Sequence, residues 1–150
     1  MTDNWSTPDP FFQKLHKEFQ FNLDVCASDW NHKCDNYFTE QDNALEKDWS
    51  GSVWCNPPYS NCGIWMKKAH EESQKGAFVV CLIPARVETN WFHDYCIPHE
   101  IRFVKGRIHF TDENNRSGRP RFGCVLVIMR PLKYDAGIRS VIQPEGLKTN

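Results

Sequence analysis

The sequence of 150 residues predicts an α/β domain with a mostly parallel sheet and an antiparallel hairpin near its C-terminal end. Three observations favour this fold class. Short apolar runs, typical of buried strands, alternate with segments of helical periodicity. Two of these runs stop at proline, at Pro57 and Pro84, and a central strand does not continue through proline. Two further runs, 100–110 and 121–129, are separated only by a polar loop, as antiparallel partners are.

The first predicted element is a helix that begins near Thr7. The Thr7 hydroxyl is placed to cap the helix, Pro8 suits the first turn, and Asp9 would lie near the positive end of the helix dipole. Apolar side chains then recur at helical spacing over 11–19.

Strands are expected over 21–27, 53–55 and 76–85, where the residues either alternate or run apolar. The segment 62–75 divides into an apolar and a charged face, which predicts an amphipathic helix that ends at Gly76.

The rest of the chain carries weaker signals. The polar segment 36–48 is expected to be irregular, and 89–95 is expected to form a short helix. After Pro131 the pattern fades. We therefore expect a single domain over 1–131 and a loosely ordered tail over 132–150.

Composition narrows the functional classes. The hydrophobic fraction is 40%, the charged fraction is 25% and the net charge is −1, so no overall basic field indicates nucleic acid or an anionic membrane. No apolar run approaches the roughly 20 residues that span a bilayer, and "MTDNWSTPDP" lacks the regions of a signal peptide. The seven cysteines form no C-x-x-C motif, which favours reduced thiols in the cytoplasm and no bound zinc.

Three polar segments directly follow predicted strands: 24–28, 56–59 and 84–89. Parallel strands bring their carboxyl ends to one edge of a sheet, and ligands of α/β sheets bind at that edge. The sequence therefore predicts one site that is formed by three loops.

The turn Asn56-Pro57-Pro58-Tyr59 carries the most specific chemistry. Asn56 offers a side-chain carbonyl and Pro57 a main-chain carbonyl, while the prolines add no N–H groups that would compete for these acceptors. Tyr59 adds a flat ring. Two acceptors beside an aromatic face suit a planar group with an exocyclic amine, whose lone pair they can direct at an electrophile. A rigid turn with a packed tyrosine is the structural alternative.

Longer stretches between Trp5 and Arg130 carry a resemblance: "WSTPDPFF", "LDVCAS", "YFTEQDNALEKDWSG", "WCNPPYS", "IPARVETNWFHD" and "IRFVKGRIHF". Through them the chain resembles the amino-methyltransferases that use S-adenosyl-L-methionine, whose signature is [DNS]-P-P-[YFW]. It resembles most closely the compact phage-encoded Dam-type DNA N6-adenine methyltransferases. The resemblance implies a compact Rossmann-like class I methyltransferase fold, S-adenosyl-L-methionine as cofactor, DNA as substrate and the cytoplasm of a bacterial host as location.

The resemblance also implies individual roles in catalysis. Asn56 and Pro57 would bind the target amine, Pro58 would complete the rigid turn, and Tyr59 would stack on a base flipped out of DNA.

For the cofactor, the resemblance implies contacts from seven residues: Thr7, Pro8, Asp24, Cys26, Asp42, Asp48 and Asn56. Thr7 and Pro8 would hold the methionine end, Asp42 would approach the ribose, and Asp48 would lie near the adenine. Many methyltransferases have a glycine-rich loop after the first strand, whereas this chain has "CASDWNH". Ordinary loop or capping carboxylates are the alternative for the three aspartates.

The residues expected to contact DNA are Arg86, Arg116, Arg119 and Arg121. A solvated loop tip is the alternative for any one of them. The four-residue turn also serves other amine acceptors, namely cytosine N4, an RNA base or protein glutamine. A DNA-binding or cofactor-binding remnant without catalysis is a further alternative.

Overall fold

Two long apolar strands form the centre of the structure, which is a computed structural model. β3 (Phe78–Pro84) and β7 (Cys124–Met129) pair antiparallel, and nearly every residue in both is buried. Strands buried on both faces need a covering layer on each side. The structure describes residues 5–114, 116–118, 122–131 and 139–142.

Within these residues the main sheet has six strands in the order β1-β2-β3-β7-β4-β8. β1 (Leu23–Asp24), β2 (Ser52–Cys55) and β3 are parallel neighbours, and β4 (Glu100–Val104) is parallel to β8 (Arg139–Ile142). β7 is antiparallel to both β3 and β4. The sheet is therefore mixed, and the expected antiparallel pairing of the last two long apolar runs is confirmed.

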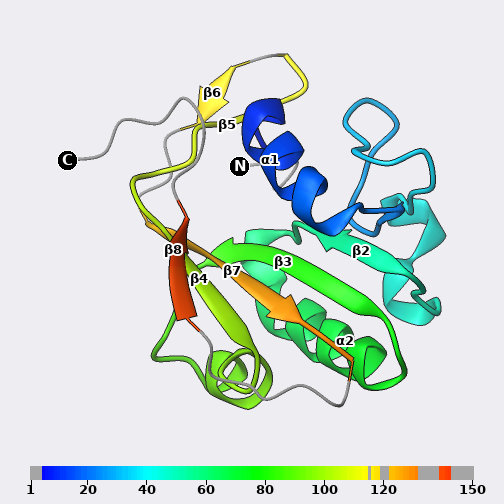
Figure 1. The fold of residues 1–150 in the computed structure, drawn as a ribbon. Helices are drawn as coiled ribbons and strands as arrows, with labels where there is room; N and C mark the ends of the chain where they lie inside the picture. Colours follow the sequence, from blue (N-terminus) through cyan, green and yellow to red (C-terminus); the bar gives the residue numbers. More distant parts are fainter. Residues whose placement is uncertain (1–4, 115, 119–121, 132–138, 143–150) are drawn as a thin grey trace.

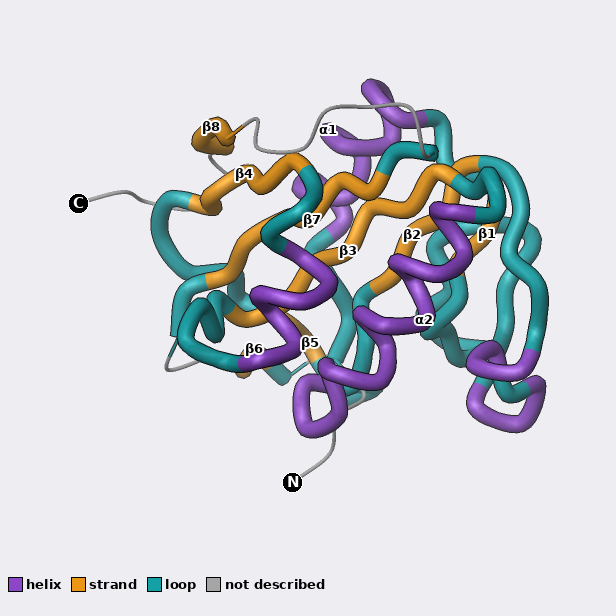
Figure 2. Tube along the Cα trace, turned by 90° about the horizontal axis from the view of Figure 1, so that it is seen from below, coloured by secondary structure: helices purple, strands orange, loops and turns teal. Residues whose placement is uncertain are grey.

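Helical segments cover both faces of the sheet (Figures 1 and 2). α1 (Asp9–Phe19) packs on one face, while α2 (Cys62–Gln74) and a π-helical segment (Phe92–Cys96) pack on the other. Alternate side chains of β3 separate the two cores: Val80 and Leu82 join the core with α1, and Val79 and Cys81 join the core with α2. This alternation follows from the two-residue period of a strand.

The prediction that the Thr7 hydroxyl caps the first helix is wrong. α1 begins at Asp9 with Pro8 at the capping position, and no side chain makes a cap hydrogen bond. The Thr7 hydroxyl instead accepts a hydrogen bond from Asn56. Because the helix starts one residue later than expected, Pro8 occupies the capping position and the Thr7 hydroxyl is used by Asn56 instead.

The expected hairpin is interrupted between its two strands. β4 ends at Val104, and the chain turns at Gly106, where φ is +83°. The intervening segment forms a separate two-stranded sheet of β5 (Phe110–Thr111) and β6 (Ser117–Gly118). Glycine adopts this φ without the steric penalty of other residues, which explains why the long strand stops there.

β8 lies within the expected loose tail. It pairs in parallel with β4 from Ile101↔Arg139 to Val104↔Ile142, and Ile142 packs against the core that contains α1. The pairing covers an edge of β4 that would otherwise be open. The sheet therefore extends beyond residue 131, and the rest of the expected tail lies outside the described residues.

None of the seven cysteines, all of which lie in the described part of the chain, forms a disulfide. Across the described part of the chain, no helix combines the length and the apolar character that crossing a membrane requires.

A buried carboxylate on α2 anchors the segment that enters β2. Glu72 is 1% exposed, and its Oε1 accepts a hydrogen bond from the Trp49 backbone N–H at 2.6 Å. Its Oε2 lies 2.6 Å from Lys75 Nζ and 3.3 Å from Lys68 Nζ. Burial opposes ionisation of Glu72, but hydrogen bonds from Lys75, Trp49 and Lys68 outweigh it and lower the pKa of the carboxyl.

We expect Glu72→Ala to lower the free energy of unfolding by about 2–4 kcal/mol, because it leaves a buried N–H and two ammonium groups without their acceptor. Lys75 keeps Asp48 as a partner in that variant, so the loss falls on the Trp49 N–H and on Lys68. Glu72→Gln should have a smaller effect, since its amide oxygen still accepts from Trp49. Glu71→Ala, on the exposed neighbour, should change stability by no more than about 0.5 kcal/mol. Urea unfolding at pH 7 compares the three variants; equal losses in Glu72→Ala and Glu71→Ala would contradict the anchor.

The same carboxylate predicts a pH dependence. A lowered pKa in the folded state means that the stabilisation is present above the unfolded pKa and is lost as pH falls through the folded pKa. The stability difference between the parent chain and Glu72→Gln should therefore shrink as the pH is lowered from 7 into the acid range.

Candidate active site

The Asn-Pro-Pro-Tyr turn lies at the carboxyl end of β2. β2 ends at Cys55, and a 3-10 turn (Tyr59–Asn61) leads directly from the prolines into α2. Because β1, β2 and β3 are parallel, the segments that follow them share one edge of the sheet, as expected from the sequence.

The side-chain amide of Asn56 is held from one side only. Its Nδ2 donates a hydrogen bond to Thr7 Oγ1 at 3.0 Å, and Thr7 is 2% exposed. Its Oδ1 is buried and has no hydrogen-bond partner among the residues that the structure describes. A buried acceptor without a donor is unfavourable by about 1–3 kcal/mol, so this oxygen is available to a donor that enters the site.

Tyr59 is partly exposed beside this amide, and its ring is held by aromatic edge contacts. The centroid of its ring lies 5.7 Å from that of Phe110 and 5.6 Å from that of Phe122, at interplanar angles of 86° and 68°. Its hydroxyl is buried near the Cys124 thiol without reaching hydrogen-bond geometry with any described residue. Burial raises the pKa of the phenol well above its usual value, so Tyr59 stays neutral.

A cavity of about 490 Å³ opens beside Asn56. Its walls come from the segment after β1, from the 3-10 turns between β1 and β2, and from Trp5 and Trp65. A smaller hollow shares Trp5, Cys26 and Asn56 with it and adds Thr7 and Asp24. The structure thus brings together four of the expected cofactor residues, namely Thr7, Asp24, Cys26 and Asn56. The segment 84–89 follows β3 at the same edge but does not line the cavity.

Asp24 is the buried acid of this site. It is 3% exposed, its Oδ1 accepts from the Cys26 N–H at 3.2 Å, and its Oδ2 accepts from the Lys33 N–H at 2.9 Å. Burial raises the pKa of Asp24 to about 6, although these two hydrogen bonds oppose the shift. Its charge therefore changes near neutral pH.

The glycine-free loop after β1 satisfies its backbone internally. The N–H of Cys26 donates to Asp24, that of Ala27 to the Phe38 carbonyl, and that of Ser28 to Asn31 Oδ1 at 2.8 Å. The N–H groups of Cys26, Ala27 and Ser28 are therefore already used within the protein.

Asp42 shapes one wall of the cavity without lining it. Its carboxylate accepts from the Thr39 N–H at 2.8 Å and from the Thr39 hydroxyl at 3.1 Å, and these bonds lower its pKa. They close a turn that places Thr39, Glu40 and Asn43 at the cavity. Asn43 has φ of +55°, a left-handed conformation that asparagine tolerates better than most residues.

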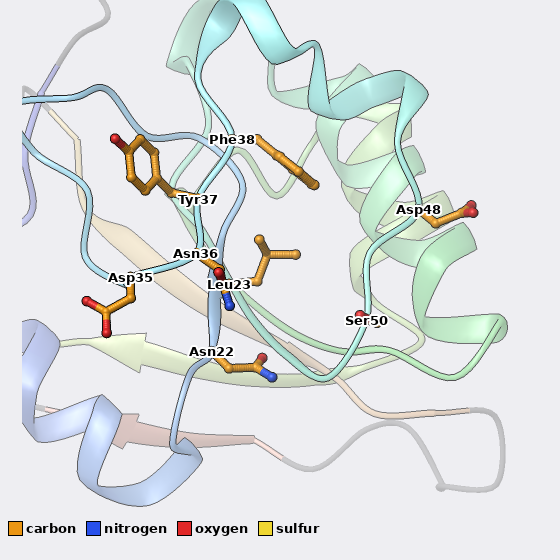
Figure 3. A pocket seen from close by; sticks show the side chains of 8 residues that line it. All are labelled: Asn22, Leu23, Asp35, Asn36, Tyr37, Phe38, Asp48 and Ser50. Carbon is orange, nitrogen blue, oxygen red and sulfur yellow. The ribbon is translucent and has the colours of Figure 1, made fainter.

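Asp48 lies in a different, open pocket of about 420 Å³ (Figure 3). This pocket is at the outer side of β1 and is also lined by Asn22, Asp35 and Asn36. The Asp48 side chain is 94% exposed and pairs with Lys75 at 3.2 Å, and in Figure 3 it points away from Asp35. The structure therefore does not bring Asp48 to Asn56. Pro8 occupies the capping position before α1 and lies outside the set that lines the cavity.

The arginines expected to contact DNA lie in two places. Arg86 is exposed directly after β3, at the same edge as Asn56. Arg116 lies between β5 and β6, where its side chain is 74% exposed and its Nε is 3.1 Å from Asp112. Arg119 and Arg121 lie outside the described residues.

Sequence reasoning missed several residues that line the cavity: Trp5, Asn31, Thr39, Glu40 and Trp65. The motif "WSTP" and the polar "TEQDN" stretch contained usable signals, because Trp5 directly precedes the predicted cofactor segment and Thr39 and Asp42 have the spacing of a closed turn.

Comparison with known proteins gives consistent matches. A family profile described as DNA N-6-adenine-methyltransferase (Dam) matches residues 1–150. A DNA N-6-adenine-methyltransferase of Escherichia phage T1 is 29% identical over 158 residues, covering 87% of this chain and 64% of that protein. A DNA N-6-adenine-methyltransferase of Haemophilus phage HP1 is 36% identical over 129 residues, covering 76% of this chain and 74% of that protein. A putative methyltransferase YfdM of Escherichia coli K12 is 42% identical over 65 residues, covering 38% of this chain and 71% of that protein.

Proposed function

The chain belongs to the DNA N-6-adenine-methyltransferase (Dam) family, and we propose that it transfers a methyl group from S-adenosyl-L-methionine to the N6 amine of adenine in DNA. The observation that carries the proposal is the buried, unpartnered oxygen of Asn56 at the edge of a cavity. The chain spans 64% of the phage T1 protein, so the activity is proposed for the part that is present here.

Asn56 and Pro57 act on the amine. Asn56 Oδ1 accepts one N–H of the target amine, and the main-chain carbonyl of Pro57 accepts the other. The lone pair of an aromatic amine is delocalised into the ring, which makes the nitrogen a poor nucleophile. Holding both hydrogens favours a more tetrahedral nitrogen and aims its lone pair. S-adenosyl-L-methionine, when bound, supplies the electrophilic methyl group. Neither acceptor is a base at neutral pH, so the surplus proton of the methylated amine passes to water.

Tyr59 presents its ring to the target base. Extruding a base from a duplex is unfavourable by a few kcal/mol, and stacking on an aromatic side chain offsets part of this. The edge contacts with Phe110 and Phe122 fix the ring before the base arrives. DNA contacts from Arg86, Arg116, Arg119 and Arg121 are part of the same proposal.

The residues around the cavity suit the cofactor. Its volume of about 490 Å³ lies within the roughly 300–1,000 Å³ of small-molecule sites. Thr39, Glu40 and Asn43 offer hydrogen-bonding side chains for a sugar and a base, and Trp65 offers an apolar wall. Asp24 offers a carboxylate for a cationic ligand. We therefore place the cofactor in this cavity and give no role to Asp48.

The fold belongs to the proposal as well. Helices on both faces, and a single antiparallel strand inserted between β3 and β4, are compatible with a compact Rossmann-like class I methyltransferase fold. We propose one such domain, which includes β8.

Other amines could in principle receive the methyl group at this site, and each predicts a different product. The Asn56 geometry would serve cytosine N4, an RNA base or a glutamine amide equally well, because all are planar amines. Adenine in DNA is favoured by the family and by the names of the phage relatives. The intact Asn56 acceptor disfavours a non-catalytic remnant.

Labelled transfer tests the substrate. The protein is incubated with tritiated S-adenosyl-L-methionine and DNA from cells without adenine methylation, and the DNA is digested to nucleosides. We expect the label in N6-methyladenine. Label in N4-methylcytosine, label in protein or RNA, or no transfer would contradict the assignment.

Asn56→Ala should lower kcat by about 10²–10³-fold, the usual effect of removing one preorganised hydrogen-bond partner of a transition state. The dissociation constant of the cofactor should stay within about threefold, because the lost group faces the amine. Asn36→Ala, in the pocket of Figure 3, is the matched control and should leave both constants unchanged. A loss of cofactor affinity as large as the loss of kcat would refute the role of Asn56.

The Asp24 pKa of about 6 predicts a pH-dependent affinity. A cationic ligand prefers the ionised carboxylate, so affinity should be highest above pH 7 and fall by up to tenfold per pH unit below the pKa. Calorimetric titration between pH 5 and 8 measures this slope. Asp24→Asn should flatten it, and an unchanged slope in that variant would rule Asp24 out as the titrating group.

A further inference from the structure

We propose that Thr7 is a positioning residue for Asn56, and that the β5–β6 sheet fixes Thr7 through the segment Trp5–Thr7. The effect on turnover rests on the proposed function. The contact itself can be tested without it.

The contact is a buried hydrogen bond between two groups that are far apart in the chain. Asn56 Nδ2 donates to Thr7 Oγ1 at 3.0 Å, and Thr7 is 2% exposed. The start of α1 does not use this hydroxyl, because α1 begins without a side-chain cap. The Thr7 oxygen is therefore committed to Asn56.

The hydrogen bond holds the side-chain amide of Asn56 in the site. When a carboxamide turns by 180°, its oxygen and its nitrogen exchange positions with almost no change in shape. With Nδ2 bound to Thr7, the oxygen faces the amine as an acceptor. Without the Thr7 hydroxyl, Nδ2 is a buried donor with no acceptor, which favours rotation of the amide away from its productive orientation.

The segment that carries Thr7 is held by the small sheet. The Ser6 N–H donates to the Thr111 carbonyl at 2.7 Å, and the Thr111 N–H donates to the Ser6 carbonyl at 3.2 Å. The ring of Trp5 lies against Gly118 on β6, where a Cβ atom would come within 2.7 Å of it. Trp5–Thr7 thus joins β5 and β6 by an antiparallel bridge and a close ring contact.

This arrangement links the β5–β6 sheet to the target amine. Arg116, a proposed DNA contact, lies between β5 and β6, and Thr7 lies at the other end of the same chain of contacts. The position of the Asn56 acceptor therefore depends on residues more than fifty positions away in the sequence.

Thr7→Val keeps the shape of the side chain and removes the hydroxyl. We expect kcat at saturating cofactor to fall roughly tenfold or more, with the dissociation constant of the cofactor within about threefold. Thr7→Ser keeps a hydroxyl and should recover most of the turnover. A variant that loses cofactor affinity as much as kcat, or one that Thr7→Ser fails to rescue, would overturn the positioning role.

A double-mutant cycle on stability tests the contact independently of turnover. Thr7→Val should lower the unfolding midpoint in the parent chain and lower it clearly less in the Asn56→Ala chain, because the partner is already absent. Equal shifts in both chains would show that the hydrogen bond does not exist. If this coupling is found but the parent chain transfers no methyl group, the proposed function fails and the contact stands.

Two glycine variants test whether the β5–β6 sheet supports Thr7. Gly118→Val should displace Trp5 and lower kcat at saturating cofactor roughly tenfold. Gly123→Val is the control, because nothing lies within 4 Å of a Cβ atom at Gly123. The same kcat in the parent chain and Gly118→Val, or equal losses in both glycine variants, would overturn the proposed support.

Discussion

The structure depends on the point where β2 must stop. Pro57 and Pro58 have no N–H groups for a sheet and restrict the backbone, so β2 ends at Cys55 and the chain leaves the sheet at Asn56. The 3-10 turn and α2 follow at once, with Pro58 at the start of the turn. Asn56 is thereby held at the carboxyl edge between a rigid strand and a rigid helix. The unpartnered oxygen follows from this constraint together with the bond to Thr7.

The buried acids divide into two kinds. Glu72 is surrounded by donors, which lower its pKa and make it an anchor of the framework. Asp24 has two backbone donors but no side-chain cation close enough to overcome burial, so its pKa rises to about 6. An acid that is poorly compensated in the free protein gains most from a cationic ligand. This difference separates the part of the molecule that holds the fold from the part that is ready for a ligand.

Local sequence signals predicted the features that depend on neighbouring residues in the chain. The apolar runs predicted the strands, the amphipathic pattern predicted α2, and the two prolines located Asn56 at a strand end. Contacts between distant segments could not be predicted in this way. Thr7 followed the local rules for a helix cap, but α1 begins one residue later and the Thr7 hydroxyl binds Asn56, which is 49 positions away in the sequence. β8 pairs with β4 only because the folded sheet offers an open edge.

The cavity shows the same limit. Asp42 and Asp48 were expected to approach the cofactor because they are acids in a stretch that resembles a known family. In the structure the Asp42 carboxylate closes a turn, so that Thr39 and Glu40 line the cavity, while Asp48 lies in another pocket. Which residue of such a turn faces a ligand depends on the hydrogen bonds that close the turn, and composition does not reveal them.

The central claim is that the side-chain oxygen of Asn56 accepts a hydrogen bond from the target amine. Single-turnover methyl transfer by Asn56→Asp and Asn56→Leu tests it most directly, because both have nearly the shape of asparagine and only aspartate keeps an acceptor. The account predicts that Asn56→Asp retains measurable transfer, with the Thr7 hydroxyl now donating to one oxygen, and that Asn56→Leu loses about 10²-fold or more. Transfer by Asn56→Leu at the rate of the parent chain would contradict the account.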